Sequence, residues 1–403
     1  MALIPVAEAL ARVLDGAVAL PSEQVALADA VGRVLSEDVV AKRTQPPQDV
    51  SAMDGYAVRA ADVASVPARL KLIGEVAAGR PLAATLKAGE AARIFTGGVL
   101  PEGSDTVVIQ ENTAREGDLV LVNFTATAGK NVRPAGLDFA QGYVGLRKGR
   151  RLTGRDVSLA AAMNHPTLPV HRRPKVAIAA TGDELVPPGT EPKAGQIVHS
   201  NAFALAAIAR REGAEVIDLG IWPDKLDDTI AGVQRGRAAG ADVLLTSGGA
   251  SVGDYDLIQP ALKAEGLELA FWKIAMRPGK PLLSGRLGTM RVIGLPGNPV
   301  SSYVCSAVFL APLLRRLSGR PDGALPTGTA VLGRDLKEND ERADYLRATL
   351  VRRDDGTLVA TPFPQQDSSM LVPLAAADCL VIREPFEAAA KAGAPCRFVA
   401  LEE

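Results

Sequence analysis

Three glycine-rich loops, each directly after a short apolar run, place the strongest constraint on the fold of this chain. The apolar runs span residues 176–180, 243–246 and 292–295, and the loops span residues 181–185, 247–254 and 295–299. Helix-length segments separate the runs, and this alternation predicts parallel strands in a three-layer α/β domain. The carboxyl ends of parallel strands meet at one edge of a sheet, where ligands bind. We therefore expect the three loops to converge on one site.

The second loop carries the sharpest signal for an anion site. Gly248, Gly249, Ser251 and Gly253 give it backbone N–H groups that can turn toward a phosphate. Asp254 and Asp256 follow at the start of a predicted helix. Acidic residues in a first helical turn also stabilise the helix dipole by roughly 0.3–1 kcal/mol, which is the structural alternative for this pair.

The first and third loops supply carboxylates and a rigid turn. Asp183 and Glu184 lie at a loop tip, where carboxylates usually face water, but magnesium favours one or two carboxylates together with substrate oxygens. Pro296 and Asn298 lie in a turn that leads into a helix near Pro299, a position that suits proline. The need for a rigid turn between a strand and a helix explains most of the pattern in the third loop.

Three cations lie within eight residues of one another, between the second and third loops. They are Lys273, Arg277 and Lys280, and prolines flank the last of them. A lysine on the surface is the usual structural explanation. Their position beside acidic loops favours instead a wall that neutralises an oxyanion.

Composition excludes several classes of protein. The 45 basic and 46 acidic residues give a net charge of −1, so we expect neither nucleic acid nor a membrane as a partner. Three scattered cysteines without a C-x-x-C spacing support neither a disulfide framework nor a zinc site. The apolar segment 300–314 is interrupted by serines and is predicted to be too short to span a bilayer. The N-terminus lacks a signal-peptide core, so we expect a cytoplasmic protein.

The pattern of apolar residues and glycines changes several times along the 403 residues of the chain. Helical patterns at 6–13 and 25–35, and again near 155–163, flank a region of short β-type runs punctuated by glycine. This predicts a split N-terminal domain at 1–45 and 140–173, with an inserted β-rich domain at 46–139. An α/β domain at 174–322 and a small C-terminal β domain at 323–403 follow.

Taken together, seven motifs resemble the molybdopterin molybdenumtransferase family, the type that includes the E domain of gephyrin. The motifs are Met53-Asp54-Gly55-Tyr56-Ala57, Thr96-Gly97-Gly98, Thr181-Gly182-Asp183-Glu184-Leu185, Ser200-Asn201, Ser247-Gly248-Gly249-Ala250-Ser251-Val252-Gly253-Asp254-Tyr255-Asp256, Pro278-Gly279-Lys280-Pro281 and Gly294-Leu295-Pro296-Gly297-Asn298-Pro299. Each is modest by itself, but their shared order over nearly the whole chain is highly specific.

The resemblance implies a four-domain homodimer whose active cleft lies between the α/β domain of one subunit and the inserted domain of the other. It implies a Mg²⁺-dependent reaction in which molybdate and adenylylated molybdopterin give molybdenum cofactor and AMP. The preceding adenylyltransferase and the acceptor molybdoenzymes are the protein partners that it suggests. Physically, the molybdate needs cations and N–H donors, and the diphosphate needs a divalent metal.

The resemblance also assigns residues to the site. The functional set that it implies is Asp54, Thr96, Asp138, Glu184, Asp224, Asp256, Lys273 and Arg277. Magnesium and the diphosphate would be held by Asp183, Glu184, Asp254 and Asp256. Molybdate or phosphate would be contacted by Lys273, Arg277, Lys280, Arg347 and Ser368, and the substrate also by Gly248, Gly249, Ser251, Gly253, Pro296 and Asn298. Arg277 stands where lysine is common in the family, which keeps the charge but changes the donor geometry.

Two other functions compete with this interpretation. An adenylyltransferase that acts one step earlier, on molybdopterin and ATP, shares the α/β domain, but the flanking motifs argue against it. A scaffold with a vestigial pterin site would bind a partner peptide instead. The intact acidic and basic loops argue against that alternative.

Overall fold

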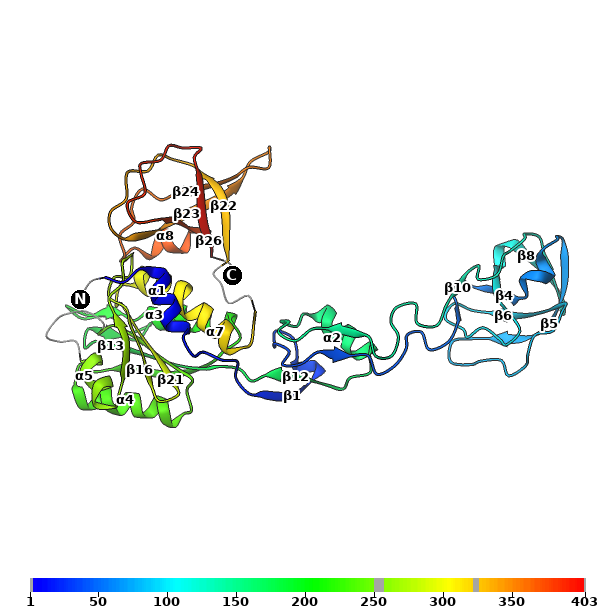
Figure 1. Cartoon of the computed structure of the whole chain (residues 1–403), viewed down its shortest axis with the longest axis horizontal. Coiled ribbons are helices and arrows are strands. Elements are labelled where there is room, and N and C mark those ends of the chain that lie inside the picture. Colours follow the sequence, from blue (N-terminus) through cyan, green and yellow to red (C-terminus); the bar gives the residue numbers. More distant parts are fainter. Residues whose placement is uncertain (1–2, 250–256, 322–325, 402–403) are drawn as a thin grey trace. The chain divides into compact units, whose positions relative to one another are not determined.

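The computed structural model describes residues 3–249, 257–321 and 326–401. The chain forms two compact units (Figure 1). The first contains Met1–Glu23, Gly32–Ser36 and Pro169–Glu403, and the second contains Gln24–Val31 and Glu37–Leu168. The finer division into four domains stays a prediction.

A six-stranded sheet forms the centre of the first unit. In spatial order its strands are β16 (Glu215–Trp222), β13 (Lys175–Thr181), β17 (Val243–Ser247), β21 (Met290–Leu295), β20 (Leu283–Leu287) and β18 (Glu268–Trp272). The three predicted strands β13, β17 and β21 lie side by side and parallel, as expected. The sheet as a whole is mixed, however, because β20 and β18 pair antiparallel to their neighbours. Only Gly288 and Thr289 separate β20 from β21, which is too short for a parallel crossover.

Helices cover both faces of this sheet, because successive side chains of a strand point to opposite faces. In β13, Val176 and Ile178 enter one core, whereas Ala177 and Ala179 enter the other. The first core includes α1 (Val6–Leu14), α3 (Asn201–Arg211), α6 (Pro299–Cys305) and α7 (Ala311–Leu317). The second includes α4 (Leu226–Ala238) and α5 (Ile258–Ala264). The three-layer α/β prediction is confirmed.

The apolar helix at 299–317 is longer than the sequence suggests. A π-helical turn, η4 (Ser306–Leu310), joins α6 to α7 without a break. The resulting 19-residue helix is long and apolar enough to cross a membrane, so the predicted length limit is wrong. Its burial gives the better reason for assigning it to the core, since 83% of its most apolar window lies inside the protein.

The C-terminal part of the first unit is a closed β-barrel. Its strands follow one another around the barrel as β23 (Ala343–Arg352), β24 (Leu358–Pro362), β22 (Thr327–Leu332), β26 (Pro395–Ala400) and β25 (Cys379–Arg383). Pairing of β25 with β23 closes it. The short strand β19 (Met276–Arg277) joins β23 from outside, and α8 (Leu371–Ala375) lies between β24 and β25 in the chain.

The second unit is built on another six-stranded sheet. Its strands are, in spatial order, β7 (Thr106–Ile109), β4 (Gly55–Val58), β6 (Glu90–Ile94), β5 (Ala68–Val76), β9 (Leu119–Val122) and β8 (Thr113–Glu116). The predicted helix near 155–163 is confirmed as α2 (Gly154–Ala162), which begins with a capping box of Thr153 and Asp156. The helix predicted at 25–35 is wrong. Val25 belongs to strand β1 (Ser22–Ala26), and Leu27 begins a single 3-10 turn, η1 (Leu27–Asp29).

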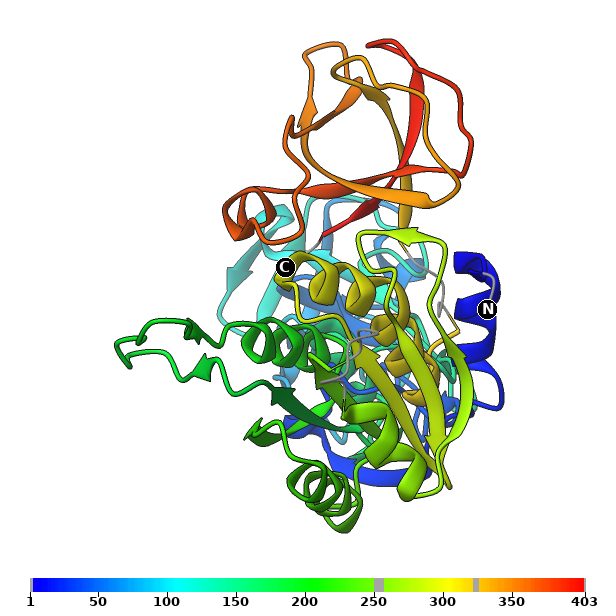
Figure 2. The ribbon, with the colours of Figure 1, turned by 90° about the vertical axis from the view of Figure 1, so that its left-hand side faces the viewer.

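The remaining strands are short. They are β2 (Val39–Val40), β3 (Val50–Ser51), β10 (Val132–Arg133), β11 (Val144–Leu146), β12 (Thr167–His171), β14 (Leu185–Val186) and β15 (Ile197–Val198). Strands β14 and β15 pair with each other in an arm that extends from the α/β domain between β13 and α3 (Figure 2).

Candidate functional site

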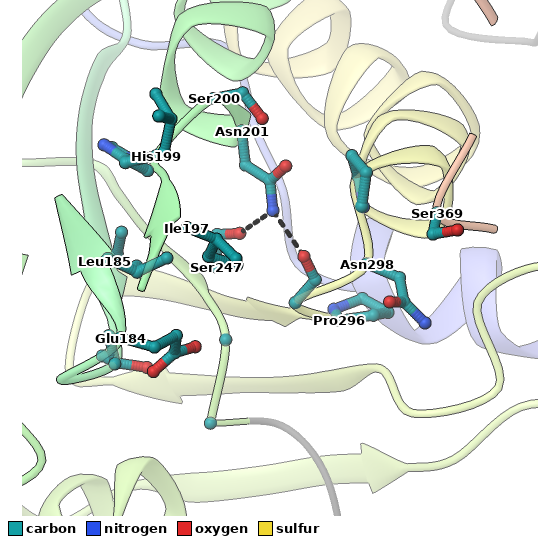
Figure 3. A pocket seen from close by; sticks show the side chains of 18 of the residues that line it. Glu184, Leu185, Ile197, His199, Ser200, Asn201, Ser247, Pro296, Asn298 and Ser369 are labelled. Atoms are coloured by element: carbon teal, nitrogen blue, oxygen red, sulfur yellow. Dashed lines mark hydrogen bonds between the residues drawn. The ribbon is translucent and has the colours of Figure 1, made fainter. Parts of the chain in front are cut away.

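A cavity of about 630 Å³ lies at the carboxyl ends of β13, β17 and β21 (Figure 3). The three glycine-rich loops contribute Thr181 and Gly182, then Ser247 to Gly249, then Pro296 to Asn298. The arm adds Ile197 and His199. The predicted convergence of the loops on one edge of the sheet is therefore observed.

Glycine is required where the second loop approaches the first. Gly248 and Gly249 have φ angles of +98° and +62°, a conformation that residues with a side chain rarely adopt. A Cβ atom on Gly248 would lie 2.7 Å from the carbonyl oxygen of Thr181. The close packing of these two loops shapes the floor of the cavity.

Asn201 connects the three parts of the cavity wall. Its Nδ2 donates to the hydroxyl of Ser247 at 2.8 Å and to the carbonyl oxygen of Gly297 at 2.7 Å (Figure 3). The amide at the start of α3 thereby joins the loop after β17 to the loop after β21. Ser200 stands at the N-cap of α3 but makes no capping bond with its side chain, so the neighbouring Asn201 carries the polar interaction.

We expect Asn201→Ala to weaken substrate binding or turnover by roughly tenfold, because each lost hydrogen bond is worth about 1 kcal/mol and both loops lose an anchor. Asn123→Ala, at an exposed asparagine that does not line the cavity, is the matched control and should leave the kinetics unchanged. Steady-state kinetics of both variants test this. Equal activity of wild type and Asn201→Ala would show that the loops hold their positions without the amide.

Carboxylates gather at the acidic side of the cavity. Glu184 and Asp224 both line it. Asp224 and Asp183 exchange hydrogen bonds, since the backbone N–H of Asp224 donates to Asp183 Oδ1 at 3.1 Å and that of Asp183 donates to Asp224 Oδ2 at 3.4 Å. Within the described part of the chain, no three His, Cys, Asp or Glu side chains form a cluster able to hold a metal by themselves.

The predicted cations do not line this cavity. Among the described residues that surround it there is no lysine or arginine. Lys273 has a φ of +81° and places its Nζ 4.8 Å from the centre of the Trp272 ring. Lys280 is exposed, and the next residue, Pro281, does line the cavity.

The Arg277 side chain pairs with carboxylates of the C-terminal barrel. Its Nε donates to Asp344 Oδ1 at 2.7 Å, and its Nη1 donates to Asp340 Oδ2 at 2.9 Å. These contacts, the bond from Asp344 first, raise the pKa of Arg277 above its ordinary value. The observed side chain therefore fastens strand β19 to the barrel.

Three family models together match most of the chain. These are the MoeA N-terminal region (domain I and II) at residues 4–164, the probable molybdopterin binding domain at 177–316 and the MoeA C-terminal region (domain IV) at 329–401. A molybdopterin molybdenumtransferase from a Nostoc species is 40% identical over 338 residues, which cover 82% of this chain and 77% of the relative. The one from Haemophilus influenzae is 33% identical over 365 residues, 90% of each chain. This chain belongs to the molybdopterin molybdenumtransferase family.

Solved structures agree with this assignment. Two structures of the molybdopterin biosynthesis MoeA protein from Pyrococcus horikoshii superpose with TM-scores of 0.87 and 0.83, at 31% and 28% identity. They cover 100% and 99% of this chain and 100% of their own chains. The resemblance stated from seven sequence motifs is confirmed over the full length.

Two residues that the family resemblance assigns to an anion lie at the barrel. Arg347 is only 1% exposed, and its guanidinium donates to the carbonyl oxygens of Met370 and Asp367 at 2.8 and 2.9 Å. It thereby shapes the loop that carries Ser368. The Ser368 hydroxyl accepts a hydrogen bond from Asn298 Nδ2 at 3.1 Å, which ties this loop to the third glycine-rich loop.

In the second unit, Asp54 and Thr96 form one polar contact although 42 residues separate them. Asp54 Oδ1 accepts hydrogen bonds from both the backbone N–H and the hydroxyl of Thr96, each at 2.8 Å. These bonds, the backbone one first, hold the pKa of Asp54 below its usual range, and Arg93 adds to the effect. Asp138 lies exposed in the same unit, and its backbone N–H donates to Gln45.

Four of the predicted site residues, Ser251, Gly253, Asp254 and Asp256, lie outside the described residues. In contrast, Asn201 and His199 line the cavity but are missing from the predicted set. Burial lowers the pKa of His199, which favours its neutral form. The Ser200-Asn201 motif had already marked this place in the sequence, but the partners of Asn201 lie 46 and 96 residues away.

Proposed function

We propose that this chain inserts molybdate into adenylylated molybdopterin, with cleavage of the phosphoanhydride bond and release of AMP, to form molybdenum cofactor. The observation that carries the proposal is the cavity at the carboxyl ends of β13, β17 and β21. Polar side chains and glycines of the three loops surround it, at the edge of the sheet where α/β proteins bind their ligands. The family of the relatives supports the same reaction, and the matched N- and C-terminal regions favour it over the earlier adenylyltransferase step.

The carboxylates fit a magnesium ion bound together with the substrate. Mg²⁺ usually keeps several waters and takes one or two protein carboxylates along with phosphate oxygens. Glu184 and Asp224 supply two carboxylates at the cavity, and Asp183 is hydrogen-bonded beside them. When bound, the ion would neutralise charge on the diphosphate during bond cleavage. This chain's own contribution is to hold the diphosphate in the cavity that the three loops form.

The decisive experiment measures AMP release from adenylylated molybdopterin and magnesium, with and without molybdate, together with the metal content of the pterin. We expect AMP release that depends on molybdate and is matched by molybdenum incorporation. Consumption of ATP with free molybdopterin would identify the adenylyltransferase instead. A folded protein that is silent in both assays, and whose melting temperature does not change when the pterin is added, would favour a scaffold with a vestigial pterin site.

We expect Glu184→Ala to reduce turnover by roughly 100-fold, because an electrostatic group that acts on developing charge is worth that much in rate. Its unfolding free energy should change by only about 0.5 kcal/mol, since an exposed loop carboxylate contributes little to packing. Glu191→Ala, another exposed carboxylate in the same arm, is the control. Full activity of Glu184→Ala would remove this residue from the reaction.

We also propose that the protein is a cytoplasmic homodimer, as the resemblance implies, and that Asp54 and Thr96 act on substrate held by the partner subunit. Their hydrogen bonds hold a carboxylate and a hydroxyl together, between the start of β4 and the loop after β6. Mixing inactive Asp54→Ala and Glu184→Ala subunits would then restore part of the activity, because one complete site forms in each mixed dimer. Persistent inactivity of confirmed mixed dimers would place both residues in a site made by one chain.

A further inference from the structure

A second cavity lies at the opposite edge of the α/β sheet, at the amino ends of β17 and β21. Its volume is about 490 Å³, and it is lined by arginines 172, 286 and 291 together with Gly16 and Thr289. An adjoining cavity of about 550 Å³ shares Arg172, Asp242, Gly288 and Thr289 with it. The two therefore form one polar recess that includes none of the residues of the first site.

Two of the three arginines already have carboxylate partners. Arg172 forms a bidentate pair with Asp242, with both N–O distances at 2.7 Å. Arg286 pairs with Asp15 at 2.9 Å and also donates to the backbone carbonyl of Asp15. Gly16 leaves room for this guanidinium, because a Cβ there would lie 3.2 Å from Arg286 Nη2.

Arg291 is different, because it is buried without a carboxylate. It is 9% exposed, and its Nη1 donates to the backbone carbonyl of Val13 at 2.9 Å. Within the described residues its Nε and Nη2 have no hydrogen-bond partner and it forms no ion pair. Burial lowers the pKa of Arg291, the positive charge of Arg286 adds to this, and the carboxylate of Asp15 opposes it. The Nε and Nη2 edge of Arg291 is left to donate to a ligand in the recess.

We propose that this recess binds a phosphate group, with Arg291 as the anchor. The free Nε and Nη2 edge of a guanidinium can hold two oxygens of a phosphate side by side. Asp242 and Asp15 pair with Arg172 and Arg286, and Glu265 pairs with Arg237 of the adjoining cavity. Arg291 is left as the cation that an anion would offset. The adjoining cavity gives room for the organic part of a phosphomonoester. The site lies away from the loops that hold the substrate and does not depend on the proposed reaction.

Calorimetric titration with inorganic phosphate and with glycerol 3-phosphate tests this proposal on the full chain. The key variant is Thr289→Glu, which places a carboxylate at the exposed rim and leaves the buried core intact. We expect it to weaken phosphate binding by roughly tenfold or more, whereas the neutral Thr289→Gln should bind like wild type. Arg291→Gln should lose binding as well.

Asn201→Ala separates the recess from the first site, because Asn201 lines the cavity at the other edge of the sheet. Phosphate affinity that survives Asn201→Ala but falls in Thr289→Glu supports the proposal. Tighter binding of glycerol 3-phosphate than of inorganic phosphate would identify a phosphomonoester as the ligand, and equal binding would identify free phosphate. Phosphate binding that is unchanged in Thr289→Glu, or is absent from the wild type at millimolar concentration, would overturn the proposal.

Discussion

Glu212→Gln is expected to lower the free energy of unfolding by about 3–5 kcal/mol, because it removes the carboxylate charge at the centre of a buried ion-pair cluster. The Glu212 side chain is 2% exposed at the end of α3. Its two oxygens accept from Arg315 at 2.8 and 2.9 Å, and Arg320 adds a third contact at 3.1 Å. The cluster fastens α3 to the end of α7, within the largest core of the α/β domain.

Urea unfolding of the wild type and the variant measures this loss. Glu8→Gln is the matched control, since Glu8 pairs with Arg12 on the surface of α1 with 46% of its side chain exposed. An exposed pair of that kind is worth less than about 1 kcal/mol. Similar small losses in both variants would show that the buried arginines are solvated well enough to do without their carboxylate.

The same cluster gives a pH dependence. Burial raises the pKa of Glu212, but the bond from Arg315 and the charges of the other arginines outweigh this, so the folded pKa lies below the ordinary value. The ionised carboxylate therefore stabilises the fold above the pKa of the unfolded chain, and this contribution disappears as the pH falls toward the folded pKa. The wild type should lose more stability than Glu212→Gln between neutral pH and about pH 4.

Gly248→Val is expected to reduce turnover by roughly 100-fold or more, since a displacement of about 1 Å in a site can cost that much. Two independent obstacles combine at this position. The φ of +98° is unfavourable for valine, and the new Cβ would meet the carbonyl oxygen of Thr181 at 2.7 Å. The second loop must then move away from the first and take its N–H groups with it.

Gly266→Val is the control for Gly248→Val, because it introduces the same backbone strain at a position outside the cavity. Gly266 has a similar φ of +87°, but a Cβ there meets nothing within 4 Å, and the residue lies after α5 and away from the cavity. Both variants should lose about 1–3 kcal/mol of stability from backbone strain, but only Gly248→Val should lose turnover. Equal turnover in the two would mean that the approach of the two loops is not needed for activity.

The sequence was sufficient to predict what depends on local patterns. Runs of small and β-branched residues such as Val176–Ala180 fix the buried strands, and glycine marks the loops at their carboxyl ends. Because parallel strands must bring these loops to one edge, the place of the cavity followed without a structure. The identity of the family came from motifs and their order, which do not depend on knowing any contact.

Contacts between distant residues left no local pattern to read. Nothing near Arg347 in the sequence indicates that its charge is buried against carbonyl groups of the loop after β24. Arg277 looked available for an oxyanion, but its partner Asp344 lies 67 residues further along the chain. The sequence pattern predicted a parallel sheet, but β20 runs antiparallel to its neighbours. Only the short connection through Gly288 between β20 and β21 indicates this direction in the sequence.

The first unit consists of stretches of chain that lie far apart in the sequence, and this determines when its parts can fold during synthesis. Helix α1 leaves the ribosome long before α7, but it packs in the same core as Leu313 and Leu314 of α7, about 300 residues later. The second unit, whose segments end at Leu168, can close its own cores long before that. The nascent chain must therefore carry an unpaired amphipathic helix throughout most of translation, and this exposed apolar face is a natural target for a chaperone that binds unfolded segments.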